Sequence, residues 1–93
     1  MIKLAGDRIE VTGPITMAGA AALLAEGEAV LASADPVFDL AGVTELDSSS
    51  LAVIFSWVRT ARARGKSVRL LNPPQNLLSL AEVYGVADLL PQH

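Results

Sequence analysis

A chain of 93 residues with a net charge of −3 is long enough for one hydrophobic core, and it predicts a single domain spanning residues 1–93. Hydrophobic residues make up 52% of the chain, which excludes a disordered protein, and the absence of cysteine excludes disulfides and thiolate metal sites. No apolar run is long enough to span a bilayer and the first residues form no apolar signal core, so we expect a cytoplasmic protein.

The charges are unevenly distributed along the chain. No lysine or arginine occurs from Ile9 to Val58, whereas five basic residues follow between Arg59 and Arg69. A basic cluster can bind nucleic acid or acidic lipid, but cations near the end of a helix also complement the helix dipole. Because the cluster is small and the whole chain is acidic, we do not expect nucleic-acid binding.

The first elements are predicted to be two strands and a helix. Ile2–Ala5 and Arg8–Thr12 alternate apolar and polar residues around a tight turn, which is typical of paired strands. Gly13-Pro14 is expected to stop the second strand. Apolar residues then recur at helical spacing over Met17–Ala32, which predicts a helix with Thr16 as its cap. Its apolar face comprises Ala20, Leu23, Leu24, Gly27 and Leu31.

A strand and a longer helix are predicted next. Val37–Leu40 is an apolar run that indicates a short central strand. The pattern over Leu51–Arg64 is that of an amphipathic helix, and Gly65 is expected to end it. The core face of this helix comprises Leu51, Ile54, Phe55 and Val58.

The last third of the chain predicts one more strand and one more helix. Ser67–Leu71 reads as the strand, and Asn72 as the cap of a helix that begins with prolines and stops at Gly85. Its apolar face comprises Leu77, Leu80, Ala81 and Tyr84. Val86–Leu90 is expected to form a short helical turn or an edge segment. This order of elements predicts an α/β fold: a mixed sheet of about four strands, backed by three main helices plus a short C-terminal helical turn.

The turn Asp47–Ser50 lies between the central strand and the second helix. Either Asp47 or Ser48 can cap this helix, because each side chain can accept hydrogen bonds from free backbone N–H groups of the first turn. The three serines therefore lie at the positive end of a helix, where a negative group such as phosphate is favoured. The plainer alternative is that Asp47 and Ser48 only cap the helix.

The sequence offers few side chains for catalysis. The one histidine is the final residue, His93, so a serine–histidine pair would need the chain terminus as its base. Glu45 and Asp47 could form an acid–base pair, but nothing around them in the sequence suggests a tuned pKa. Metal-ligand spacings and glycine-rich phosphate loops are absent from the sequence. We therefore expect a binding function, with no catalytic residue, no metal and no cofactor.

The central strand, the turn Leu46–Leu51 and the following helix resemble the signature of STAS domains, a family named for sulphate transporters and anti-sigma factor antagonists. The resemblance covers almost the whole chain. Ser67–Pro73 and Leu80–Val86 are similar to the MlaB-type branch, the small STAS subunits of Mla-type phospholipid ABC transporters. The resemblance implies one STAS-like domain that binds the ATPase subunit of such a transporter, which maintains outer-membrane lipid asymmetry. It would lie in the cytoplasm, peripheral to the inner membrane, and would reach the membrane only through the transporter complex.

The resemblance also implies which residues contact the partner. The family's partner-contacting or phosphorylatable hydroxyl corresponds to Ser48 and the next family position to Ser49, while Ser50 stands where many relatives have glycine. The alternative function is that of an anti-sigma factor antagonist, in which phosphorylation of Ser48 controls binding to a kinase-like anti-sigma factor.

The expected docking surface is the turn together with a ridge of the second helix. The ridge Ser50–Val53–Trp57 is expected to be exposed, with Trp57 as an interface anchor. The alternatives are that Trp57 packs beneath a neighbouring helix and that Val53 only flanks the core. In full, the expected surface comprises Asp47, Ser48, Ser49, Ser50, Leu51, Val53 and Trp57.

Overall fold

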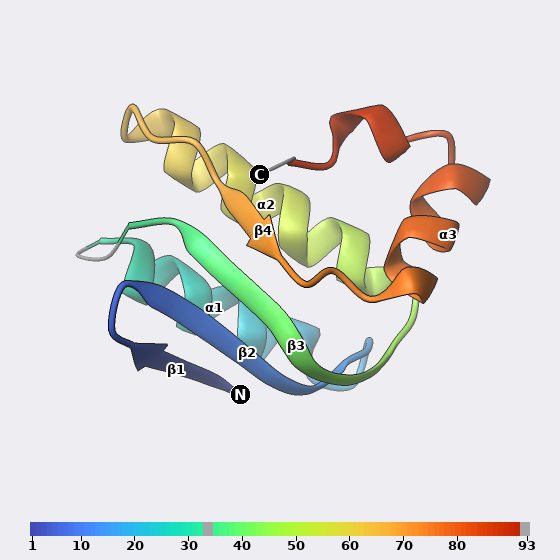
Figure 1. Ribbon diagram of the computed structural model, residues 1–93, viewed down its shortest axis with the longest axis horizontal. Coiled ribbons are helices and arrows are strands. Elements are labelled where there is room, and N and C mark those ends of the chain that lie inside the picture. Colours follow the sequence, from blue (N-terminus) through green and yellow to red (C-terminus); the bar gives the residue numbers. More distant parts are fainter. Residues whose placement is uncertain (33–34, 92–93) are drawn as a thin grey trace.

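The computed structural model of the protein describes residues 1–32 and 35–91. Figure 1 shows the order of the elements, which form a mixed sheet with helices packed on it. Within the described residues the chain forms β1 (Ile2–Ala5), β2 (Arg8–Ile15), α1 (Ala20–Leu31), β3 (Val37–Leu46), α2 (Ser49–Ala63), β4 (Arg69–Leu71), α3 (Gln75–Val83) and a short 3-10 helix (Ala87–Leu89). The predicted fold class is therefore confirmed.

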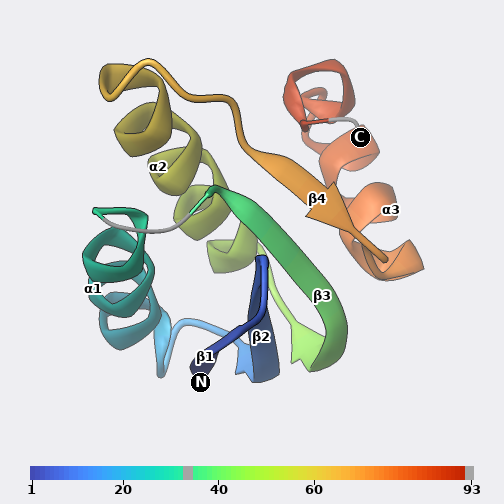
Figure 2. The same ribbon diagram turned by 60° about the vertical axis from the view of Figure 1, so that its left-hand side comes forward.

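The strands lie in the sheet in the order in which they occur in the sequence, β1-β2-β3-β4. β1 pairs antiparallel with β2, whereas β2 with β3 and β3 with β4 are parallel. The two parallel connections run through α1 and α2. Right-handed crossovers that advance in the same direction place their helices on the same face of a sheet. α1 and α2 accordingly lie side by side behind the sheet, while α3 lies beyond β4 (Figure 2).

The core lies between the sheet and these helices. Ile9 and Val11 of β2 and Phe38 and Leu40 of β3 point to the helices and are at most 1% exposed. Burial of every second residue is expected for a strand that has one face packed against the core. The buried residues contributed by the helices and by β4 are Leu23, Leu31, Leu51, Val53, Ile54, Trp57, Ala61, Leu70, Leu77 and Ala81.

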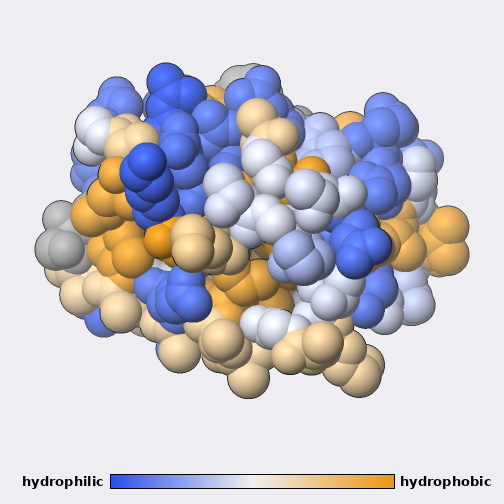
Figure 3. Space-filling model, turned by 90° about the horizontal axis from the view of Figure 1, so that it is seen from below, coloured by the Kyte–Doolittle hydropathy of each residue, from blue (hydrophilic) through white to orange (hydrophobic). Residues whose placement is uncertain are grey.

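The opposite face of the sheet is not covered by a helix and is polar. There Asp39 of β3 accepts hydrogen bonds from the side chains of Arg8 and Asn72 at 3.0 and 3.1 Å and from the backbone N–H of Ala41 at 3.0 Å. Arg8 and Asp39 also form an ion pair. Seen from below (Figure 3), hydrophilic residues gather along the upper side of the molecule and pale hydrophobic residues along the lower rim, where α1 lies. One face of the sheet is therefore polar, and the other face is covered by helices.

Two strands are longer than the sequence predicts. β2 runs through Gly13 and Pro14 to Ile15, although these two residues were expected to stop it. β1 begins opposite Val11 and therefore does not reach Pro14, and the register of β2 with β3 shifts between Gly13 and Ile15. The missing N–H of proline therefore leaves no partner in the sheet without a hydrogen bond. β3 likewise continues past Leu40 to Leu46, because residues as far as Leu46 pair with β2. β4 is shorter than predicted and begins at Arg69.

Two helices begin later than predicted, α1 by three residues and α3 by two. α1 begins at Ala20, and Thr16 does not cap it; the carbonyl of Thr16 accepts a hydrogen bond from Gly19 instead. α3 begins at Gln75, and Asn72 does not cap it because its side chain donates to Asp39. The expected cap is thus replaced by a local turn before α1 and by a bond to a distant strand before α3.

The ends of α2 and α3 are as predicted. Gly65 and Gly85 have φ values of +75° and +72°, a conformation that suits a residue without Cβ. After α2, the backbone N–H of Lys66 donates to the carbonyl of Ala61 and that of Gly65 to Arg62, which is the Schellman arrangement. Tyr84, predicted on the apolar face of α3, is instead 58% exposed next to Gly85.

Candidate functional site

Asp47 organises the turn between β3 and α2. One carboxylate oxygen accepts hydrogen bonds from the backbone N–H (2.9 Å) and the hydroxyl of Ser49, and the other accepts from the backbone N–H of Met17 at 3.1 Å. A single side chain therefore caps α2 and holds the segment that leads into α1. Ser48 occupies the backbone position before α2, but its side chain makes no capping hydrogen bond. Of the two predicted caps, Asp47 performs the function.

The same hydrogen bonds lower the pKa of Asp47. The Ser49 hydroxyl contributes most, followed by the backbone N–H groups of Met17 and Ser49, because each stabilises the ionised carboxylate. A general acid at neutral pH needs a raised pKa, so this geometry gives no support to an acid–base pair with Glu45, which is exposed. His93 lies outside the described residues. Within residues 1–32 and 35–91, no three acidic or histidine side chains gather as a metal site would require.

The three serines of the turn have three different environments. Ser48 is exposed at the start of α2, where a hydroxyl is available to a partner or to a modifying enzyme. Ser49 is half-buried and donates to Asp47. Ser50 is fully buried and donates to the backbone carbonyl of Asp47 at 2.7 Å. Ser48 is therefore the member of the three that can be contacted directly.

The expectation of an exposed ridge on α2 is wrong. Ser50 and Trp57 are 0% exposed and Val53 is 3% exposed. The Trp57 ring stacks on Phe38 with ring centroids 4.5 Å apart, and its Nε1 donates to the carbonyl of Leu24 at 3.3 Å. α1 covers this side of α2, so these three residues support the docking region from beneath and do not reach its surface. The alternative prediction for Trp57, that it packs beneath a neighbouring helix, is the one that the structure supports.

Two shallow depressions flank the exposed start of α2. One, of about 260 Å³, lies between α1 and α2, and its lining includes Leu24, Ser49 and Ala52. The other, of about 290 Å³, lies between α2 and the end of α3 and is lined by Ser48, Leu51, Phe55, Tyr84 and Val86. Both are mainly apolar, which is typical of a surface that packs against another protein.

Sequence reasoning did not assign several of these residues to the site. Ala52 is exposed between the two depressions, and an alanine on the outer face of an amphipathic helix carries no signal of its own. Phe55 was predicted as core and is only half-buried. Tyr84 and Val86 lie immediately before and after Gly85, and their position beside Ser48 depends on how α3 packs.

Comparison with known proteins agrees with this fold. A family model described as "Mlab, STAS domain" matches residues 2–91. The chain is 33% identical over 51 residues to the "Intermembrane phospholipid transport system binding protein MlaB" of Haemophilus influenzae. That match covers 55% of this chain and 49% of the relative, so the chain spans about half the length of the curated relative it matches.

Two solved structures are similar in fold. The anti-sigma factor antagonist SpoIIAA in its unphosphorylated form superimposes with a TM-score of 0.72 at 14% identity, over 100% of this chain and 86% of SpoIIAA. The crystal structure of Mglu superimposes with a TM-score of 0.62 at 27% identity, over 81% of this chain and 20% of that chain. Within the part of the chain that the structure describes, no helix is both long enough and apolar enough to cross a membrane.

Proposed function

This chain belongs to the MlaB-type STAS-domain family, and on that premise we propose that it is a non-catalytic accessory subunit of a phospholipid ABC transporter that binds the transporter's ATPase. The name of the Haemophilus relative, a binding protein of an intermembrane phospholipid transport system, supports the transport context. The protein would lie in the cytoplasm, peripheral to the inner membrane, and would reach the membrane through the transporter complex.

The observation that carries this proposal is the exposed start of α2 with an apolar depression on each side. We define the docking surface as Asp47, Ser48, Ser49, Leu51, Ala52 and Phe55. Its outermost residues, Ser48 and Ala52, are small and lie one helical turn apart, so a helix of a partner can approach closely and place larger side chains in the depressions. The buried Ser50, Val53 and Trp57 hold this surface in place.

The substitution Ala52→Arg tests the docking surface. Alanine and arginine are both good helix formers and residue 52 is exposed, so the fold should be retained while a large charged side chain fills the contact region. We expect the tagged wild-type protein to retain an ABC ATPase in a pull-down from the source cell, and Ala52→Arg to weaken that interaction at least about tenfold.

Ala29→Arg is the matched control. Residue 29 is an exposed alanine in the last turns of α1, outside the docking surface, so the same substitution there should leave the interaction unchanged. An ATPase that is retained equally by wild type and both variants would contradict this docking surface. Failure to retain any ABC ATPase would contradict the proposed function itself.

A second candidate function is that of an anti-sigma factor antagonist. It is favoured by the exposed hydroxyl of Ser48 beside Asp47. Phosphorylation of Ser48 would add roughly two negative charges to the docking surface, and the helix N-terminus would offset their repulsion from Asp47 only in part. Capture of a kinase-like anti-sigma factor that is lost on Ser48→Asp would establish this function. Unchanged partner affinity for both Ser48→Asp and Ser48→Ala would contradict a role for Ser48 in either function.

A further inference from the structure

Three neighbouring depressions form one groove along α2. The depression at Ser48 shares Phe55 with a second one, which is lined by Phe55, Val58, Arg59, Arg62 and Leu89. The second shares Val58, Arg62 and Leu89 with a third, of about 200 Å³, which extends to Lys66, Ser67, Val68 and Pro91. We call this continuous feature the α2 groove. From Ser48 to Arg62 it follows 14 residues of helix, or roughly 21 Å at 1.5 Å per residue.

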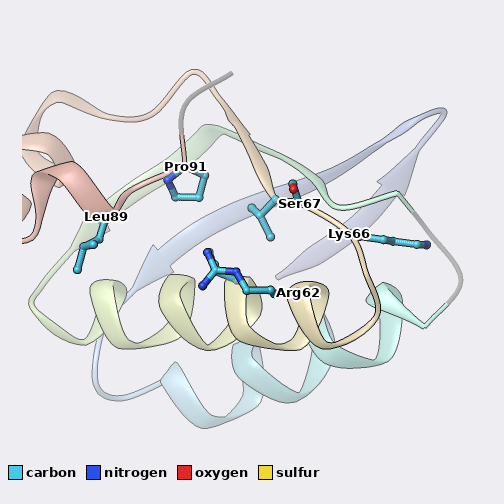
Figure 4. Close-up of a pocket in the computed structure, with 7 residues that line it drawn as sticks. Arg62, Lys66, Ser67, Leu89 and Pro91 are labelled. Carbon is cyan, nitrogen blue, oxygen red and sulfur yellow. The ribbon is translucent and has the colours of Figure 1, made fainter.

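The character of the α2 groove changes from one end to the other. At Ser48 its lining is mainly apolar, with Leu51, Phe55 and Val86. At the other end the lining includes Arg62, Lys66 and Ser67 and is more polar. Figure 4 shows the Arg62 side chain extending from α2 toward Leu89 and Pro91, whereas Lys66 extends in the opposite direction. The groove is therefore apolar at its start and basic at its end.

The cations of the groove have no carboxylate partner among the described residues. Arg8 and Asp39, on the far face of the sheet, form the ion pair found in residues 1–32 and 35–91. The facing C-terminal segment carries two exposed carboxylates, Glu82 and Asp88, and neither lies within 4.0 Å of Arg59, Arg62 or Lys66. A charge-complementary ligand would therefore find these cations available.

Capping of α2 does not account for this cluster. The last carbonyls of the helix, those of Ala61 and Arg62, already accept hydrogen bonds from the backbone N–H groups of Lys66 and Gly65. The helix dipole favours a cation in the last turn, which explains Arg62, but its effect falls off within one turn. Arg59 lies before that turn and Lys66 lies beyond the helix.

We propose that the α2 groove binds an acidic amphipathic segment of the partner protein, with apolar residues at the Ser48 end and carboxylates beside Arg62. Lys66, whose side chain points away from Arg62, adds positive charge at that end of the groove. The proposal rests on the proposed function, because the groove begins on the docking surface. An extended segment of about six residues spans the groove at about 3.3 Å per residue. A concave groove suits an extended peptide segment, whereas the surface of a bilayer is flat.

Binding of two synthetic peptides to the full chain tests the proposal. The first peptide carries two leucines followed by three glutamates, and the second has glutamines in place of the glutamates. We expect the glutamate peptide, followed by fluorescence anisotropy of an attached dye, to bind at least about tenfold more tightly, and its affinity to fall as salt is added.

Two variants with the same change in net charge locate the binding site. The double variant Arg62→Gln, Lys66→Gln should lose about tenfold in affinity for the glutamate peptide. The double variant Arg64→Gln, Arg69→Gln changes exposed cations that do not line the groove, so it should lose no more than about twofold. Equal losses in both variants, or equal binding of both peptides, would overturn the proposal.

Vesicles of phosphatidylglycerol distinguish a membrane from a peptide. Binding to these vesicles that depends on Arg62 and Lys66, without binding of the glutamate peptide, would overturn the proposal in favour of a lipid surface. The peptide assay contains no ATPase, and the Ala52→Arg pull-down contains no peptide. The α2 groove and the proposed function can therefore fail separately.

Discussion

At the scale of single residues, the most informative contrast is between Asp47 and Ser48. They are neighbours, and both can cap a helix, yet only the Asp47 side chain makes the capping hydrogen bonds. Asp47 also holds the backbone of Met17, so it joins the starts of two helices. Ser48 is left exposed. The structural role therefore falls to Asp47, while Ser48 keeps an exposed hydroxyl for the proposed binding function.

Asp47→Ala should therefore destabilise the protein, and Ser48→Ala should not. Loss of the Asp47 carboxylate leaves the N–H groups of Ser49 and Met17 without their acceptor, which should lower the free energy of unfolding measurably. Ser48→Ala removes no capping hydrogen bond and should change it by less than about 0.5 kcal/mol. Urea denaturation measures both variants. The reverse ranking would assign the cap to Ser48.

Asp39 predicts how stability depends on pH. Its pKa is lowered by the hydrogen bonds from Ala41, Asn72 and Arg8, in that order, against the opposing effect of burial. A carboxyl whose pKa is lower in the folded state stabilises the fold above its unfolded pKa of about 3.9, and that stability is lost as the pH falls through the folded pKa. The protein should therefore lose stability as the pH falls below about 4.

Asp39→Asn removes this titrating group. The variant should be less stable than wild type at pH 7 by about 1–3 kcal/mol, because a buried hydrogen-bonded network is disrupted. Its stability should then decrease less than that of wild type between pH 5 and pH 2. The exposed Glu82→Gln serves as control and should follow the wild-type curve. Parallel pH profiles for wild type and Asp39→Asn would rule out this role for Asp39.

At the scale of elements, the packing of α1 on α2 depends on one glycine. Gly27 faces the Trp57 ring, and a Cβ atom at residue 27 would lie 2.1 Å from the Trp57 Nε1. The ring cannot move away freely, because it is stacked on Phe38 and hydrogen-bonded to Leu24. A glycine inside a helix is otherwise unfavourable, so its presence here is explained by close packing.

Gly27→Ala should destabilise the protein by about 1–3 kcal/mol, although helix propensity alone favours alanine by roughly 1 kcal/mol. Gly19→Ala is the control, since nothing lies within 4 Å of a Cβ at residue 19, and a loss below about 1 kcal/mol is expected there. Thermal unfolding followed by circular dichroism measures both. A Gly27→Ala protein as stable as wild type would show that α1 and α2 are not in close contact.

The elements also show which features the sequence alone can predict. The helix ends at Gly65 and Gly85 were predicted because the cause, a positive φ, is local. The starts of α1 and α3 were missed because the polar groups concerned bond to residues far away: Met17 to Asp47, and Asn72 to Asp39. Alternation predicts strands well, but their lengths depend on the neighbouring strand, as β3 shows.

The candidate site was predictable only in part for a similar reason. A helix start with a capping residue and serines is recognisable from neighbouring residues alone, and it identified Ser48 as a candidate site residue. Two ridges of α2 both have helical spacing, so periodicity cannot tell which one α1 covers. The burial of Trp57 depends on Gly27, thirty positions away in the chain, and the exposure of Phe55 depends on where the segment after Gly85 packs.

At the scale of the whole molecule, the two proposed binding features share one helix. The docking surface and the α2 groove both lie along α2, while Ile54 and Trp57 anchor the same helix in the core. The polar face of the sheet, with its Arg8–Asp39–Asn72 network, lies on the other side of the molecule. Substitutions in that network should therefore affect stability and leave the binding surfaces intact.

The sequential order of the strands has a consequence for how the chain folds as it is synthesised. Each strand of β1-β2-β3-β4 pairs with the strand made just before it, so a nascent chain extends the sheet one edge at a time and no strand has to insert between two others. The helical layer lacks this advantage. α1 leaves the ribosome before Trp57 exists, so the face of α1 around Gly27 stays uncovered until α2 emerges, and the growing chain is exposed to aggregation during this interval.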